Sequence, residues 1–186
     1  MKVSRVRLAL VLSALLTCST VVHASSFTLS LLPAGGAIAG APGSTIGWGY
    51  TIVNNSVTDW LMLTSLSADP FLHASADASL FLFPVLAPGA SQTVSYNASA
   101  LQGLFQITWD VAAPVGFTNA GLFQIGGEFW DGDPFAGGNF LASAVTQSAA
   151  YTATVTSPVP GASTLLLTGA GALALLAFRR TGRTRG

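Results

Sequence analysis

Positive charge is almost missing from this sequence outside its two ends. All seven Lys and Arg residues lie before Leu8 or after Phe178, whereas the seven Asp and Glu residues lie between those limits. From Ser25 to Phe178 the chain has no Lys and no Arg, so this region carries acidic charge alone. Nucleic acid binding by the central region is therefore excluded, because neutralising phosphates requires cationic side chains.

Cysteine is nearly absent as well. Cys18 is the one cysteine, and it lies in the apolar N-terminal segment. Thr17 precedes it, where a lipid-attachment site has a smaller residue, which disfavours lipidation. Removal of this segment leaves no cysteine, so disulfides cannot stabilise the rest of the chain and its hydrophobic core must do so.

Residues 1–24 have the three parts of a secretory signal peptide. Basic residues precede an apolar stretch from Leu8 to Val22, and small residues lead up to Ala24. We therefore predict cleavage by signal peptidase between Ala24 and Ser25. An uncleaved anchor is the weaker alternative, because an apolar stretch of about 15 residues is shorter than the roughly 20 residues that span a bilayer.

Residues 158–186 combine a second apolar segment with a terminal cluster of Arg residues. The charge-free run from Val159 to Phe178 would extend about 30 Å as a helix, which matches the hydrocarbon thickness of a bilayer. We predict a transmembrane helix over residues 164–178 and a cytoplasmic Arg cluster over residues 179–185, which leaves the preceding domain on the periplasmic side. A buried helix is the alternative, but the Arg residues behind it would serve no core.

The C-terminal segment contains in order the Val159-Pro160 pair, a spacer of small residues, the apolar run and the terminal Arg residues. This arrangement resembles the PEP-CTERM sorting signal of Gram-negative bacteria that make exopolysaccharide. Gly161 and Ala162 occupy the places of Glu and the second Pro in the usual Val-Pro-Glu-Pro. The residues that carry the resemblance are Val159, Pro160, Arg179 and Arg180.

This resemblance implies recognition by exosortase, a membrane cysteine protease or transpeptidase that cuts near the Pro-Glu-Pro and releases or transfers the protein. The precursor is then expected on the periplasmic side of the inner membrane, and the product at the cell surface or in the extracellular matrix. A permanent inner-membrane anchor is the competing outcome.

Residues 25–157 are predicted to form one all-β domain, because apolar and polar residues alternate along several short runs separated by turn residues. The turn-forming segments are 33–43, 54–56, 69–70, 87–89, 113–116 and 131–134. We predict a single antiparallel β-sandwich of seven to nine strands, rather than one sheet closed on itself. The alternating runs are 27–31, 45–53, 92–96, 105–111, 122–130 and 151–156.

The segment from Pro42 to Asn55 resembles an early strand and turn of extracellular immunoglobulin-like modules. A Pro-Gly turn leads there into an alternating strand that ends in Asn. The cysteine pair of antibody-type domains is missing. We therefore expect Trp48, Trp60, Trp109 and Phe side chains to fill the core.

Few residues indicate catalysis. His73 with Asp69 or Asp77 could complete a Ser-His-Asp triad, but no Gly-x-Ser-x-Gly motif identifies the serine. Glu128 and its Asp neighbours could supply two carboxylates for glycoside hydrolysis. We predict no catalytic residues, no cofactor and no metal site, and keep a secreted hydrolase with an unrecognised site as an alternative.

Asp131 and Asp133, with Glu128 nearby, offer oxygen ligands at alternate positions that hard cations favour. The remaining spacing of an EF-hand loop is absent. A low-affinity calcium site and a plain acidic turn both remain open, and the turn is favoured.

These patterns predict a non-enzymatic exported protein of the surface or matrix, with exopolysaccharide as a potential partner. An inner-membrane-anchored periplasmic binding or adaptor domain is the second interpretation. Aromatic side chains near turns are candidates for contacts with carbohydrate or protein, although core packing is the expected role of each. They are Trp60, Phe71, Trp130 and Phe135.

Overall fold

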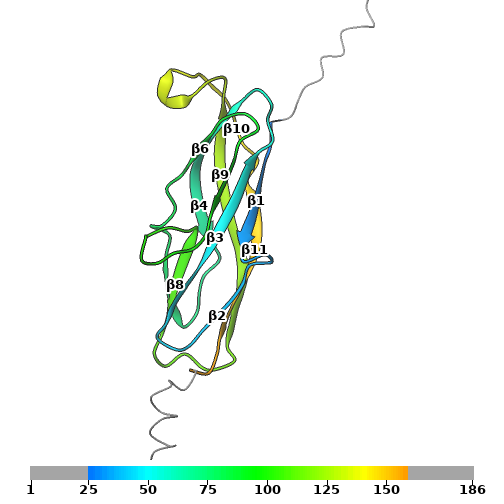
Figure 1. The fold of residues 1–186 in the computed structure, drawn as a ribbon. Coiled ribbons are helices and arrows are strands. Elements are labelled where there is room, and N and C mark those ends of the chain that lie inside the picture. The colour runs from blue at the N-terminus through cyan, green and yellow to red at the C-terminus, as the bar shows by residue number, and fades with distance from the viewer. Residues whose placement is uncertain (1–24, 159–186) are drawn as a thin grey trace, which may run out of the picture.

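The computed structural model describes residues 25–158, and these residues form two β-sheets (Figure 1). The sheets contain five and six strands, which account for all eleven strands of the described range. The one helical element in this range is a short 3-10 turn, η1 (Pro134–Ala136). The all-β prediction is confirmed for residues 25–158. The predicted signal peptide and residues 159–186 lie outside the described range.

The five-stranded sheet is built around β3 (Thr45–Asn54). All of β1 (Phe27–Leu32) pairs with one edge of β3, opposite residues 49–54. β7 (Ser91–Val94) and β8 (Phe105–Trp109) share the other edge, each pairing with one half of β3. β5 (Ala74–Asp77) pairs with β8 and forms a border of the sheet. All pairs in this sheet are antiparallel.

The six-stranded sheet is built around β9 (Thr118–Trp130), the longest strand. β4 (Trp60–Ala68) pairs with one edge of β9, and β11 (Gln147–Val155) and β10 (Phe140–Ser143) pair with the other. Two short strands complete the sheet: β6 (Val85–Leu86) beside β4, and β2 (Ala37–Gly40) beside β11. The β2–β11 pair is parallel.

The six alternating runs of the sequence correspond to β1, β3, β7, β8, β9 and β11. The prediction of seven to nine strands was too low, because most of the additional strands are short. The additional strands are β2, β4, β5, β6 and β10, and all of them except β4 have four residues or fewer. β2 lies inside 33–43, which was expected to be a turn. The antiparallel prediction is wrong for one pair, because β2 runs in the same direction as the last strand.

The two sheets enclose an aromatic core. Trp48 of β3 is fully buried, and its ring centroid lies 5.0 Å from that of Phe123 on β9 and 5.3 Å from that of Tyr151 on β11. Trp109 is 1% exposed, so both tryptophans lie in the core as predicted. Trp60 is half-buried instead, because the alternation of β4 directs its neighbour Leu61 inward.

Asn54 is a fully buried polar side chain at the end of β3. Its Nδ2 donates to the carbonyl oxygens of Asp59, Leu86 and Ala87, and its Oδ1 accepts from the backbone N–H of Ser56. Every polar atom of the side chain therefore has a partner. These bonds fix the connection between β3 and β4 and hold it against β6.

Position 49 of β3 requires glycine, because another part of the backbone passes directly over it. An added Cβ would lie 2.3 Å from the carbonyl oxygen of Val94 and 2.9 Å from the Cα of Ser95. The chain beyond β7 crosses the outer side of β3 at this point, and Tyr96 then lies over Gly47. Tyr96 donates from its hydroxyl group to Gln106 Oε1 at 3.2 Å.

The described chain enters and leaves the fold at opposite ends of the molecule (Figure 1). At the entry, the Asn55 N–H donates to the carbonyl oxygen of Ser26 next to the β3–β4 connection. At the exit, the Gly116 N–H donates to the carbonyl oxygen of Val155. The C-terminal segment therefore starts at the end of the domain farthest from the β3–β4 connection.

Candidate functional site

The residues predicted for processing fall at the borders of the described chain. Ala24 and the sorting residues Val159, Pro160, Arg179 and Arg180 lie outside residues 25–158, whereas Ser25 lies inside. No helix within the described residues is long and apolar enough to cross a membrane. The helix predicted over 164–178 lies beyond them.

The structure does not bring the proposed triad residues together. His73 is exposed, has a left-handed φ of 56°, and packs edge-on against Phe117 at a centroid distance of 4.8 Å. Asp69 accepts from the Leu122 N–H at 2.8 Å. Asp77 accepts from Gln106 Nε2 and from the Ser79 N–H, each at 2.8 Å. Within residues 25–158, neither carboxylate hydrogen-bonds to His73.

Asp131 and Asp133 both stabilise the loop that follows β9. Asp131 accepts from the Asn139 backbone N–H at 2.6 Å and from Asn139 Nδ2 at 3.0 Å, and the side-chain bond leads in lowering the pKa of the Asp131 carboxyl. Asp133 caps η1 by accepting from the Phe135 N–H. Glu128 lies across from Met62 on β4. Residues 25–158 contain no group of three or more acidic, His or Cys side chains placed to hold a metal ion.

Aromatic side chains gather at the same end of the six-stranded sheet. Trp60 of β4 and Trp130 of β9 are register partners, so their Cβ atoms are about 5 Å apart. Both are half-buried on the outer face, because Leu61 and Phe129 beside them face the core. Phe140 of β10 is 51% exposed and meets Trp130 edge-on at 5.9 Å.

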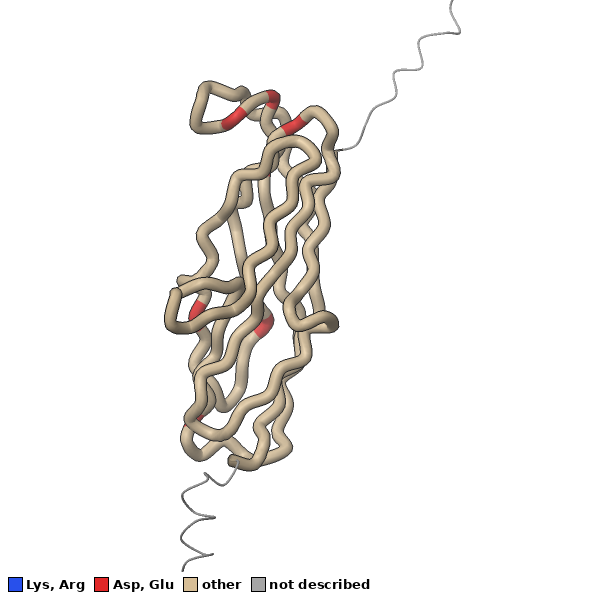
Figure 2. The backbone as a smooth tube through the Cα atoms, in the orientation of Figure 1, with Lys and Arg blue, Asp and Glu red and all other residues tan. Residues whose placement is uncertain are grey.

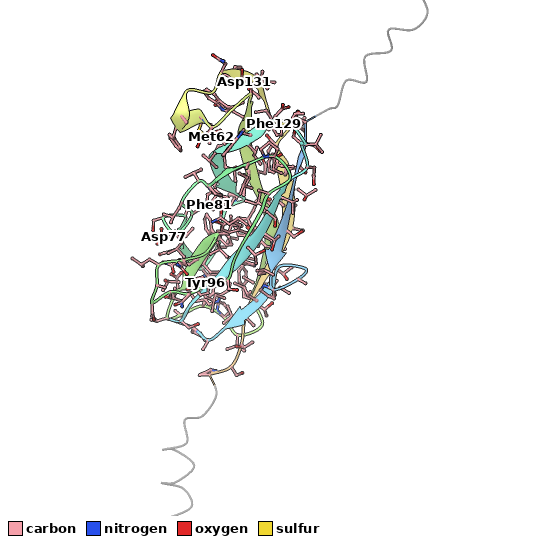
Figure 3. All side chains as sticks on the ribbon, turned by 45° about the horizontal axis from the view of Figure 1, so that its top comes forward. Met62, Asp77, Phe81, Tyr96, Phe129 and Asp131 are labelled. Atoms are coloured by element: carbon pink, nitrogen blue, oxygen red, sulfur yellow. The ribbon has the colours of Figure 1, made fainter. Side chains whose placement is uncertain are left out.

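We call this surface the aromatic end. It consists of Trp60, Trp130, Phe135 and Phe140, with the neighbouring acids Asp59, Asp131 and Asp133. Phe135 lies on η1 in the projecting loop after β9 and is 84% exposed (Figure 1). Figure 3 shows Met62, Phe129 and Asp131 toward this end of the molecule. Exposed aromatic rings beside polar groups are common at binding surfaces.

The charge at the aromatic end is negative. Figure 2 shows no Lys or Arg on the described chain, and acidic residues lie at both ends and between them. The pKa of the Asp59 carboxyl is held below its usual range, chiefly by the Ser25 hydroxyl group that donates to it. This surface therefore disfavours anionic ligands at neutral pH.

A separate groove of about 430 Å³ lies beside the free edge of β7. Its lining includes Tyr50, Leu82, Tyr96 and Gln102, and Leu82 is 78% exposed. The adjacent Phe83 has a left-handed φ of 48°, an uncommon conformation for a bulky residue. Asp77, Phe81 and Tyr96 lie on one side of the molecule in Figure 3. The side chains that line the groove are apolar or uncharged polar groups, so it offers shape and hydrogen-bonding groups to a ligand.

The structure places the aromatic residues that were candidates for ligand contacts in two different environments. Trp60, Trp130 and Phe135 lie at the aromatic end, whereas Phe71 packs against the core and stacks on Tyr151 at 4.8 Å. Sequence reasoning missed Phe140, because it follows an irregular glycine-rich loop. A search for aromatic residues just beyond that loop would have found it.

Comparison with protein-family models finds no match, and a search of curated proteins finds none either.

Proposed function

We propose that this chain is an exported, non-enzymatic protein of the cell surface or extracellular matrix of a Gram-negative bacterium, sorted through its C-terminal tail. We further propose that its folded part is an immunoglobulin-like β-sandwich that presents the aromatic end to an exopolysaccharide. Signal peptidase and exosortase are the processing partners in this proposal. The precursor is held in the inner membrane by its apolar tail until the tail is cut.

The observation that carries the proposal is the placement of the aromatic end relative to the tail. β11 ends at Val155, and the described chain leaves the domain at the end opposite to the β3–β4 connection, which leads into β4 at Trp60 (Figure 1). The tail, residues 158–186, follows from that end. A domain tethered through its tail would therefore present the aromatic end away from the membrane. Two segments that are far apart in sequence, the leader and the tail, also agree on a periplasmic position for the domain.

The chemistry of the aromatic end favours a neutral glycan. Trp and Phe faces pack against the C–H faces of sugar rings, and nearby amide and carboxylate groups accept sugar hydroxyls. Asn139 and Asp131 lie beside Trp130 on the projecting loop. Without Lys or Arg in the domain, an anionic polysaccharide has no partner for its charge.

Binding is tested by affinity electrophoresis of the chain through gels that contain a neutral glucan or an anionic polyuronate. We expect retardation by the glucan alone, and its loss in Trp60→Ala and Trp130→Ala. Val111→Ala is the matched control, because Val111 is 87% exposed beside Gly43, near the start of β3 at the opposite end. Equal retardation of parent and tryptophan variants would contradict the assignment.

Sorting is tested by fractionating the native host. A product that has lost the residues after Pro160 and is found outside the inner membrane supports processing by exosortase. A full-length mature chain that stays in the inner membrane instead supports the anchored periplasmic domain.

A further inference from the structure

The predicted signal-peptide cut and the fold meet at Ser25. Ser25 lies just before β1, and its Oγ donates a hydrogen bond to Asp59 Oδ2. The next residue, Ser26, accepts from the Asn55 N–H at 2.9 Å. The start of the described chain is therefore bound to the β3–β4 connection, next to the aromatic end.

Asp59 has no cationic partner among the described residues, because residues 25–158 contain no Lys or Arg. Its carboxylate accepts from the hydroxyl groups of Ser25 and Thr58. The charged group that acts on it across the loop is another acid, Asp131. This carboxylate is therefore placed where a positive charge would be stabilised.

We propose that cleavage between Ala24 and Ser25 creates this positive charge: the new α-ammonium group of Ser25 pairs with the Asp59 carboxylate and fastens the start of β1 to the β3–β4 connection. In the cleavage, water adds across the Ala24–Ser25 amide bond. Ala24 keeps the new carboxylate on the leader, and Ser25 keeps the amine, which takes up a proton at neutral pH. This inference rests on the export part of the proposed function.

Covalent geometry supports the pairing. The amine and the hydroxyl oxygen of one serine are about 3 Å apart. Since that hydroxyl group contacts Asp59, the amine lies within the roughly 4–6 Å over which an opposite charge favours the ionised form. In the precursor the same nitrogen is a neutral amide, so the ion pair exists only after processing.

The α-amine of Ser25 can be labelled selectively, because the sequence has few other primary amines. Lys2 is the one lysine of the chain, and it leaves with the leader. The α-amine of Ser25 is then the single primary amine of the mature chain. An amine-selective acylating reagent therefore reports on this one site, and its rate follows the fraction of unprotonated amine.

The experiment uses the chain 25–186 in detergent micelles, prepared by removing an added leader with a site-specific protease. Acylation by a succinimidyl ester is timed at pH 7 for the parent, Asp59→Asn and Asp59→Glu. Asp110→Asn is the matched control at the opposite end of the domain. Urea unfolding of each variant confirms that it is folded.

We expect the parent to react about two- to fivefold more slowly than Asp59→Asn, which is the effect of one exposed ion pair on an amine. Asp59→Glu should keep most of the slow rate, and Asp110→Asn should match the parent. About 1 M salt should reduce the difference. Equal rates in the parent and a folded Asp59→Asn would overturn the proposal.

A separate measurement tests the export part of the proposal. The mass of the exported chain from the native host shows whether it begins at Ser25. A chain that keeps residues 1–24, or begins elsewhere, overturns the claim that processing creates the pair in the cell. The acylation rates of the protease-prepared chain still decide whether the amine pairs with Asp59.

Discussion

Replacing Asn54 with leucine should lower the free energy of unfolding of the domain substantially, because Asn54 makes more hydrogen bonds than any other buried side chain of residues 25–158. The substitution keeps a similar volume but removes the amide group that serves three carbonyl oxygens and one N–H. Its nearest partners are Asp59 O at 2.8 Å and Ser56 N at 3.0 Å. The Ser56 N–H and the Leu86 carbonyl would remain buried without their partner, and the carbonyl groups of Asp59 and Ala87 would remain partly buried.

The magnitude follows from the number of groups left unpaired. Each buried polar group without a partner costs about 1–3 kcal/mol. The Ser56 N–H and the carbonyl groups together should cost about 3–5 kcal/mol, since relaxation of the loop can recover part of the loss. A domain of this size has about 5–15 kcal/mol of stability in total, so Asn54→Leu removes a substantial share.

The assay is urea unfolding of residues 25–158, followed by tryptophan fluorescence, with Asn97→Leu as the control. Asn97 is exposed and accepts one bond from the Ala100 N–H at 3.1 Å, so its replacement should cost less than about 1 kcal/mol. If Asn54→Leu costs no more than Asn97→Leu, burial of the amide network is not what stabilises the β3–β4 connection.

Three further predictions concern packing and charge. Gly49→Ala should destabilise the domain by about 1–3 kcal/mol in urea unfolding, because the new Cβ would meet a backbone carbonyl at 2.3 Å that cannot move away cheaply; an unchanged midpoint would refute the close crossing. Trp48→Phe should cost more than Trp109→Phe, since Trp48 Nε1 donates to Gly36 O at 2.8 Å, whereas Trp109 Nε1 is buried without a partner in the described chain; the reverse order in thermal unfolding would contradict this. The carboxyl pKa values of Asp59 and Asp77 are lowered by hydrogen bonds, led by the Ser25 hydroxyl group and the Ser79 N–H. The stability that these two ionised carboxylates contribute is therefore complete above the unfolded-state pKa near 3.8 and is lost as the pH falls through the lower folded-state values. At pH values below about 4, the urea concentration at the unfolding midpoint should decrease. The decrease should be smaller in the variant that carries both Asp59→Asn and Asp77→Asn.

Strands with strict alternation could be predicted from the sequence, and those without it could not. β3 places Trp48, Tyr50 and Ile52 on one face, and this period of two is readable directly. β4 breaks the period, because its register against β9 shifts between Leu63 and Ser65. β2 contains one large apolar residue, Ile38, so pairing with β11 defines it rather than its own composition.

The candidate site was predictable in its residue types and not in its geometry. Trp60 and Trp130 are visible in the sequence as aromatic residues near turns. Their pairing depends on the register between β4 and β9, which is set by packing over the whole sheet. Phe71 illustrates the limit, because it lies near a turn too and yet packs against the core.

The parallel pair of β2 and β11 makes completion of the fold depend on the last part of the domain to be synthesised. β2 cannot gain its partner until residues 152–155 are available, so this edge of the six-stranded sheet stays incomplete while the chain is still growing. Contacts between such distant parts of a chain form slowly. If the chain is exported as we propose, this delay would help it to cross in an extended state, because this edge of the sheet can be completed only after nearly all of the domain has crossed.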